Sequence, residues 1–159
     1  SKDDAAKHTF AEAKAALDAA NQGSGQAPDP HHPRYCLGYL PREGSAIVGI
    51  DIDGCIGADG TPETWARELI GTPPETYVER SPSGRGLRVL AARVEDDAEQ
   101  PDGEKHGVGI IASGKKFFTV TGRRLPEAPK IVQEARGARE RAQEWRNGGP
   151  EGGDHRGGP

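Results

Sequence analysis

The sequence is poor in the residues that build large hydrophobic cores. Of its 159 residues, 33% are apolar and 5% are aromatic, and methionine is absent. Glycine and proline are abundant instead, with 23 and 13 residues, which approaches the level found in disordered chains. The length predicts one domain with a buried core. We therefore expect a small core, with the Gly- and Pro-rich stretches outside it.

Cysteines are few, and long apolar runs are missing. Cys36 and Cys55 lack the spacing of a metal site. No signal peptide and no run long enough to span a membrane is present, which predicts a cytoplasmic protein without a membrane partner. The chain begins with Ser and contains no Met, which indicates a piece of a longer product.

The sequence also lacks an excess of positive charge. It has 21 Lys and Arg against 25 Asp and Glu, a net charge of −4. This excludes a global basic field of the kind that drives nonspecific DNA binding, so any surface for nucleic acid must be local. Basic residues do cluster in two glycine-rich segments: Arg80, Arg85, Arg88, Lys115, Lys116, Arg123 and Arg124.

Two carboxylates, Asp51 and Asp53, stand at the end of an apolar run and just before Gly54. In a strand, residues two apart share a face, so these side chains would project together from backbone positions about 7 Å apart. Such a pair is a natural seat for Mg²⁺ or Mn²⁺, and paired ions can stabilise phosphoryl transfer. The alternative is that the acids only begin a turn.

A polar, glycine-rich turn follows between two strand-like stretches. Its glycines allow unusual backbone angles, its serines add hydroxyl donors and its arginines add positive charge, which together suit phosphate binding. The alternative is an ordinary hairpin turn. The candidate residues are Ser81, Ser83, Gly84, Arg85, Gly86 and Arg88.

Residues 107–122 read as strand, tight glycine turn and strand, which predicts a β-hairpin. Lys116 and Phe118 would share one face, and Thr119 and Thr121 the other. The hairpin could bring one cation and two hydroxyls towards a common site, or it could be purely structural.

Taken in order, these segments resemble the primase-polymerase (Prim-Pol) domains of phages and plasmids, in the archaeo-eukaryotic primase superfamily. The resemblance covers residues 9–125. It is carried by "IDIDxC" at 50–55, "TYxExSPSGxGLR" at 76–88 and "FFTVTG" at 117–122. It implies a primase/polymerase of phage or plasmid replication, acting in a bacterial or phage-infected cell. Such an enzyme uses nucleoside triphosphates, a single-stranded DNA template and Mg²⁺ or Mn²⁺, and is often fused to a helicase or priming module.

By this resemblance, Asp51 and Asp53 form the first metal motif. Ser83, Gly84 and Arg88 fall in the second motif, which contacts the triphosphate. Many relatives have histidine where this chain has Arg88. Arginine can bind phosphate oxygens in a bidentate way, but it cannot act as a neutral imidazole.

The third motif departs from the family pattern. Relatives place an acid about a dozen residues before the TG pair, but residues 109–112 contain no carboxylate. The nearest acid is Glu104, which we expect on the preceding loop, and Lys116 stands where relatives usually have Arg. Loss of one carboxylate should weaken the binding of the second metal ion. Either Glu104 supplies the ligand, or the enzyme is impaired.

Two other functions fit the motifs. The segment 51–54 also resembles the nucleophile motif of haloacid dehalogenase phosphatases, in which Asp51 would form a phosphoaspartate and Asp53 would be the acid/base. That motif usually lies near the N-terminus, and Thr or Val rather than Cys55 follows it. A catalytically weak nucleotide- or nucleic-acid-binding module would explain the missing acid.

The pattern predicts an α+β fold, with a mostly antiparallel sheet flanked by helices. We expect a primase-polymerase-like catalytic domain over residues 1–146, with flexible loops at 21–33 and 94–106, and a disordered tail at 147–159. Helices are expected at 9–20, 61–70 and 130–146. Strands are expected at 35–40, 46–53, 75–80, 86–93, 107–112 and 115–121.

Overall fold

The structure is a computed structural model that describes residues 10–22, 36–41, 44–93, 103–112 and 116–148. Three helices lie in these ranges: α1 (Phe10–Gln22), α2 (Thr64–Ile70) and α3 (Arg136–Gly148). The strands are β1 (Leu37–Tyr39), β2 (Ile47–Ile52), β3 (Tyr77–Arg80), β4 (Leu87–Ala92), β5 (Gly103–Lys105), β6 (Val108–Ile111), β7 (Phe118–Val120) and β8 (Gln133–Glu134). The predicted α+β class is confirmed.

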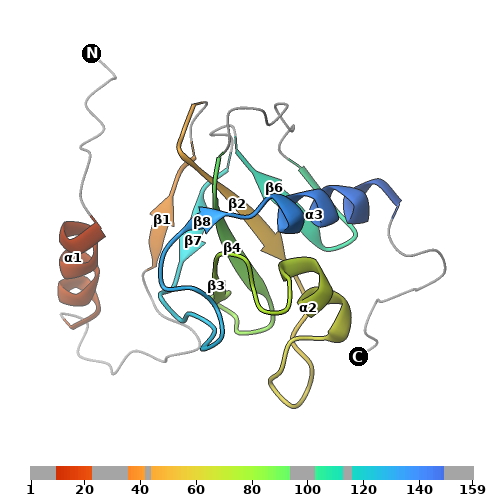
Figure 1. Cartoon of the computed structure of the whole chain (residues 1–159). Helices are drawn as coiled ribbons and strands as arrows, with labels where there is room; N and C mark the ends of the chain where they lie inside the picture. The colour runs from red at the N-terminus through yellow and green to blue at the C-terminus, as the bar shows by residue number, and fades with distance from the viewer. Residues whose placement is uncertain (1–9, 23–35, 42–43, 94–102, 113–115, 149–159) are drawn as a thin grey trace.

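The apolar run before the two acids forms the middle strand of the main sheet. The strand order is β3-β4-β2-β6-β5, and every neighbouring pair in it is antiparallel. The short β8 adds to β4 in parallel. β1 and β7 form a separate two-stranded ribbon. The predicted mostly antiparallel arrangement is therefore present (Figure 1).

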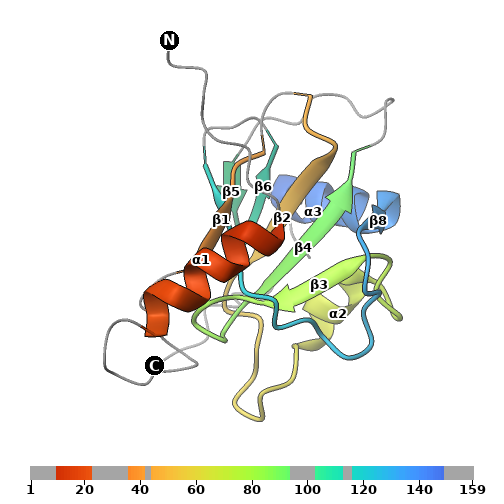
Figure 2. The ribbon, with the colours of Figure 1, turned by 90° about the vertical axis from the view of Figure 1, so that its left-hand side faces the viewer.

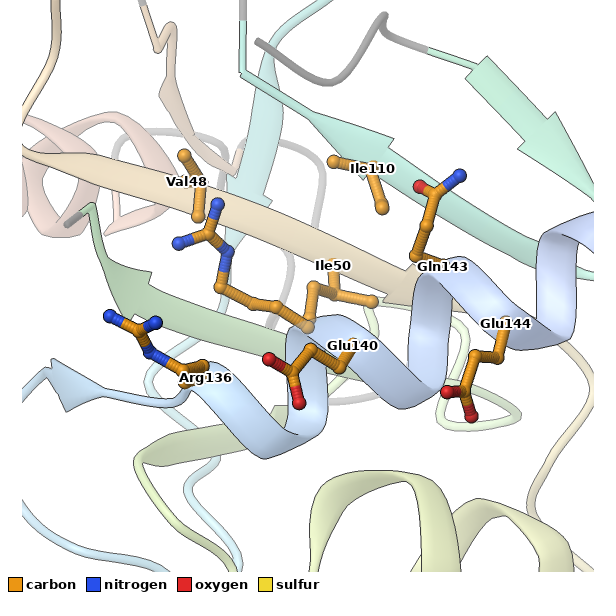
Figure 3. Close-up of a pocket in the computed structure, with 8 residues that line it drawn as sticks. Val48, Ile50, Ile110, Arg136, Glu140, Gln143 and Glu144 are labelled. Atoms are coloured by element: carbon orange, nitrogen blue, oxygen red, sulfur yellow. The ribbon is translucent and has the colours of Figure 1, made fainter. Parts of the chain in front are cut away.

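The two faces of the main sheet have different covers. Val48 and Ile50 of β2 and Ile110 of β6 face α3, as Figure 3 shows. Ile50 and Ile110 belong to the main apolar cluster, which also contains buried side chains of α2. The opposite face lies against the β1–β7 ribbon, because the ring of Phe118 packs over Gly49. Figures 1 and 2 show α3 on one side of the sheet and β1 with α1 on the other.

The predicted hairpin at 107–122 is wrong. β6 pairs with β2 and β5, whereas β7 pairs with β1. The two strands separate because all four residues of β6 are buried inside the main sheet, while Phe118 of β7 is buried against its face. Local composition indicated two strands correctly, but it carried no information on their partners.

Two helices begin later than predicted. Pro62 forms a β-bridge with Ile56, so α2 starts at Thr64 rather than at residue 61. The segment before α3 contains β8, so α3 starts at Arg136 rather than at 130. Ile131, expected on the apolar stripe of that helix, is 66% exposed. In both places a strand-type contact takes precedence over helix propensity.

The expected loops and tail fall mainly on residues outside the described ranges. This applies to 23–33 of the linker, 94–102 of the acidic loop and 149–159 of the tail. One correction concerns the acidic loop: Glu104, expected on a loop, lies in β5 and is paired with β6. A second concerns the tail, because α3 continues through 147 and 148.

Replacing Gly49 with alanine is expected to lower the free energy of unfolding by about 1–3 kcal/mol, because the new methyl group overpacks the site. Its Cβ would lie 2.6 Å from Cδ2 of Phe118. Urea denaturation measures the change. Gly38→Ala is the matched control, since its Cβ would lie at an ordinary 3.8 Å from the nearest atom. Equal losses in both variants would contradict the packing of Phe118 on Gly49.

Candidate functional site

One row of residues across the main sheet carries several of the predicted site residues. The strand register places Glu79, Arg88, Asp51, Gly109 and Glu104 side by side, on β3, β4, β2, β6 and β5 respectively. Paired residues on neighbouring strands project to the same face of a sheet. We call these five residues the charged row. It lies on the face that carries the β1–β7 ribbon.

Asp51 and Arg88 form an ion pair at the centre of the charged row. Arg88 Nε lies 3.6 Å from Asp51 Oδ1, and the side chains are only 14% and 21% exposed. Neither of these two atoms has a hydrogen-bond partner among the residues that the structure describes. The guanidinium also lies over the Phe118 ring, 5.1 Å from its centroid, and donates to the carbonyl oxygen of Thr119 at 3.4 Å. Arg88 therefore connects the sheet to the ribbon.

The electrostatic surroundings of Asp51 are unbalanced. Burial is the largest influence and raises the pKa of its carboxyl, and the negative charges of Asp53 and Glu104 raise it further. Arg88 and Lys116 act in the opposite direction, and the resulting pKa is about 6. The nearby cations thus compensate the negative charge only in part.

Gly109 leaves an opening between the two carboxylates of the row. A Cβ built on Gly109 would lie 3.7 Å from Cβ of Asp51 and 3.8 Å from Cβ of Glu104. Both acidic side chains therefore start within 4 Å of one point. A pocket of about 160 Å³ lies here. Its lining is formed by Asp51, Arg88, Gly103, Glu104, Gly109, Ile110, Ile111, Lys116, Phe117 and Thr119. Five predicted site residues are thus brought together.

Asp53 lies just beyond β2 and is exposed. It does not line the pocket, although its charge acts on Asp51. Its backbone amide donates to the carbonyl oxygen of Gly107 at 2.8 Å. The predicted phosphate-binding turn passes next to Asp53 at Gly86. A Cβ on Gly86 would lie 3.5 Å from Cα of Asp53 and 2.6 Å from the carbonyl oxygen of Ile52. Only glycine permits this approach.

The hydroxyl groups of that turn are used to hold its shape. Ser81 is buried, and its Oγ accepts from the Gly86 amide at 3.0 Å and lies 3.2 Å from Oγ of Ser83. The Ser83 hydroxyl also accepts from the amide of Arg85. Gly84 adopts a φ of +75°, which favours glycine. None of the residues 81–86 lines the pocket, so the phosphate-binding role predicted for this turn gains no direct support.

Glu79 is a buried carboxylate whose role could not be predicted from the sequence. Its two oxygens accept hydrogen bonds from the amides of Thr121 and Gly122, at 2.7 and 2.8 Å, and from the hydroxyl of Tyr77 at 3.0 Å. The Thr121 hydroxyl donates to the carbonyl oxygen of Arg80. Thr121, one of the two residues whose hydroxyls were expected at a common site, therefore links the segment after β7 to the sheet. The only sequence signal for this role of Glu79 was the presence of a single acid within the strand.

Several of the clustered basic residues also serve the fold. Arg123 donates to the carbonyl oxygens of Ser81 and Pro82. Arg124 bonds carbonyl oxygens near residue 125, and Arg80 bonds that of Gly60. Lys115 lies outside the described residues. The basic charge available to a ligand at the pocket is thus mainly that of Lys116 and Arg88.

The donor atoms of the site suit a hard divalent cation. Carboxylate oxygens are the ligands that Mg²⁺ and Mn²⁺ prefer, and no described residue bonds the buried Oδ1 of Asp51. In the described ranges, however, no three His, Cys, Asp or Glu side chains are gathered closely enough to form a metal cluster. The chemistry of the residues fits a metal ion, while the side chains are not arranged as a ready three-carboxylate cage.

A second pocket, of about 240 Å³, lies on the opposite face between the sheet and α3. Figure 3 shows its apolar floor, formed by Val48, Ile50 and Ile110, beneath charged side chains of the helix such as Arg136 and Glu140. The floor consists of core residues, and none of the predicted site residues lies there. We therefore assign the candidate site to the pocket at the charged row.

Comparison with known proteins does not identify a family: no family model matches the chain, and no curated protein is significantly similar in sequence. Within the part of the chain that the structure describes, no helix is long and apolar enough to cross a membrane.

Glu79→Gln is expected to lower the free energy of unfolding by about 1–3 kcal/mol. The amide cannot accept all three hydrogen bonds, and it places a donor against buried donors. Thermal and urea denaturation would measure the loss. Glu134→Gln is the matched control, because Glu134 is an exposed acid on a strand. A stability equal to that of the control variant would show that the Glu79 hydrogen bonds do not hold the ribbon.

Proposed function

We propose that this protein is a metal-dependent nucleotidyltransferase of the primase-polymerase type, which adds nucleotides to a DNA strand on a single-stranded template. The observation that carries the proposal is the charged row, in which Asp51, Arg88 and Glu104 share one sheet face and one pocket with Lys116. Carboxylates for a cation beside basic groups for phosphates are the combination that phosphoryl transfer needs.

The charged residues in and beside the pocket have distinct roles in this proposal. Asp51 and Glu104 in the pocket, with Asp53 just outside it, would hold Mg²⁺ or Mn²⁺, which would compensate the charge that develops on the transferring phosphoryl group. Lys116 contributes a mobile point charge, and Arg88 a planar guanidinium that can bind phosphate oxygens. Because Arg88 is held by Phe118 and Thr119, its charge is fixed in position before substrate binds.

Glu104 supplies the acid that the third motif lacks. Relatives have a carboxylate in the strand that contains Gly109, whereas here the neighbouring strand provides one at the same level of the sheet. Gly109 has no side chain, so the space between Asp51 and Glu104 stays open. In this proposal, Glu104 on the adjacent strand β5 takes the place of the acid that is missing from β6.

Extension of a labelled primer on single-stranded DNA, with deoxynucleotides and Mn²⁺ or Mg²⁺, tests the function. Asp51→Asn/Asp53→Asn is expected to reduce incorporation at least about 100-fold, because the metal ions lose their main ligands. Asp18→Asn, in an exposed ion pair on α1, is the control and should retain wild-type activity. Absence of incorporation by folded wild-type protein would contradict the proposal.

Glu104→Gln is expected to lower incorporation about 10-fold or more and to raise the Mn²⁺ concentration needed for half-maximal rate. Adding Gly109→Glu to this variant should restore part of the rate, since a Cβ at Gly109 makes only ordinary contacts. The control is Glu127→Gln, an exposed acid outside the pocket. An unchanged Mn²⁺ dependence in Glu104→Gln would exclude Glu104 as a ligand.

A second function is favoured by one observation. The three carboxylates are not gathered into a cluster among the described residues, and residues 109–112, the region where relatives have an acid, contain no carboxylate. A nucleotide- or nucleic-acid-binding module without catalytic activity would have these properties. Binding of template or nucleotide by a wild type that incorporates nothing would identify this function. The phosphatase alternative stays a prediction, and no described contact favours it.

A further inference from the structure

Phe117 is an exposed aromatic residue at the candidate site. It is 74% exposed, while its sequence neighbour Phe118 is fully buried. Among the described residues, the other exposed large hydrophobic side chains are Leu40 and Ile131, and neither lines this pocket. The Phe117 ring lies against Gly38 of β1, because a Cβ there would be 3.8 Å from its Cδ2. Backbone on one side thus supports the ring, and most of its surface faces solvent.

The pocket beside Phe117 is too small for a whole nucleotide. Its volume of about 160 Å³ is well below the roughly 300–1,000 Å³ typical of sites that enclose small molecules. Its charged lining of Asp51, Arg88, Glu104 and Lys116 suits a metal ion and phosphates. The sugar and base of a nucleotide whose phosphates lie there must therefore extend beyond the pocket.

The geometry points to Phe117 as the platform on which the base of that nucleotide stacks. Phe117 is the exposed aromatic side chain among the residues that line the pocket, and it is next to Lys116 in the chain. Each nucleobase has a flat π-face, so stacking on an aromatic ring tolerates every base and is stronger for the larger purines. This inference rests on the proposed function, because it needs a nucleotide in the pocket.

Equilibrium binding of dATP and of inorganic triphosphate separates the base from the phosphates. Isothermal titration calorimetry on the full chain, with Mn²⁺ but without template or primer, measures both affinities. Phe117→Ala is expected to weaken dATP binding about 5- to 100-fold, as loss of one stacking contact does, and to leave triphosphate binding unchanged. Phe117→Trp should bind dATP at least as tightly as the wild type. dCTP should bind more weakly than dATP to the wild type.

Two further variants control for shape and for general loss of apolar surface. Phe117→Leu keeps an apolar side chain without a π-face and should bind dATP nearly as weakly as Phe117→Ala. Ile131→Ala removes another exposed apolar side chain, outside the pocket, and should change neither affinity. Because Phe117 is exposed, its truncation should leave the urea midpoint nearly unchanged.

The remaining outcomes overturn the inference in distinguishable ways. Wild-type protein that binds dATP no more tightly than triphosphate has a phosphate site without a base platform. If Phe117→Ala weakens both ligands equally, the ring shapes the pocket instead of stacking. Self-association that is lost in Phe117→Ala, with dATP affinity unchanged, would make the ring a protein contact. If the wild-type protein binds neither dATP nor triphosphate, the proposed function itself is contradicted.

Discussion

The attachment of the β1–β7 ribbon to the main sheet is the constraint on which the candidate site depends. It rests on a buried carboxylate, Glu79, that accepts hydrogen bonds from the two backbone amides directly after β7, and on Gly49, whose missing side chain admits the Phe118 ring. Buried carboxylates with such partners are strongly held, because leaving them unpaired is costly. The ribbon in turn supplies the ring and the carbonyl oxygen that hold Arg88 beside Asp51.

Much of the fold could be predicted from local patterns. The apolar run that ends in Asp51 and Asp53 gave a strand, and alternation or turn residues located most of the other strands to within a few residues. Pairing was harder to predict. The glycine turn near residue 114 suggested a hairpin, but burial of β6 on both faces and of Phe118 over Gly49 separates the two strands. Strand pairing depends on contacts between residues that are distant in sequence, so a short stretch of sequence does not reveal it.

The sequence indicated which residues belong to the candidate site better than it indicated how they are arranged. Asp51 and Arg88 were identified from motif and charge, and the structure places them in contact. Glu104 was named as a possible ligand, but its place beside Asp51 is visible only in the strand register, in which both residues flank Gly109 of β6. More than 50 residues of sequence separate the two acids. The hydroxyl groups of Ser81 and Ser83 accept hydrogen bonds from the turn's own amides, because groups that suit phosphate oxygens equally suit a local turn, and their predicted phosphate contact stays a prediction.

The hydrogen bonds from Thr121 and Gly122 to Glu79 span more than 40 residues of sequence. Contacts of this kind close long loops, and their entropic cost is recovered only when the whole fold forms. The walls of the pocket likewise come from segments around residues 51, 88, 104 and 117. No short fragment can carry the site. A local opening that releases the ribbon would leave the six-stranded sheet intact. It would nevertheless remove the Phe118 ring and the Thr119 carbonyl oxygen that hold Arg88, so the site can be lost by a smaller unfolding event than that of the whole fold.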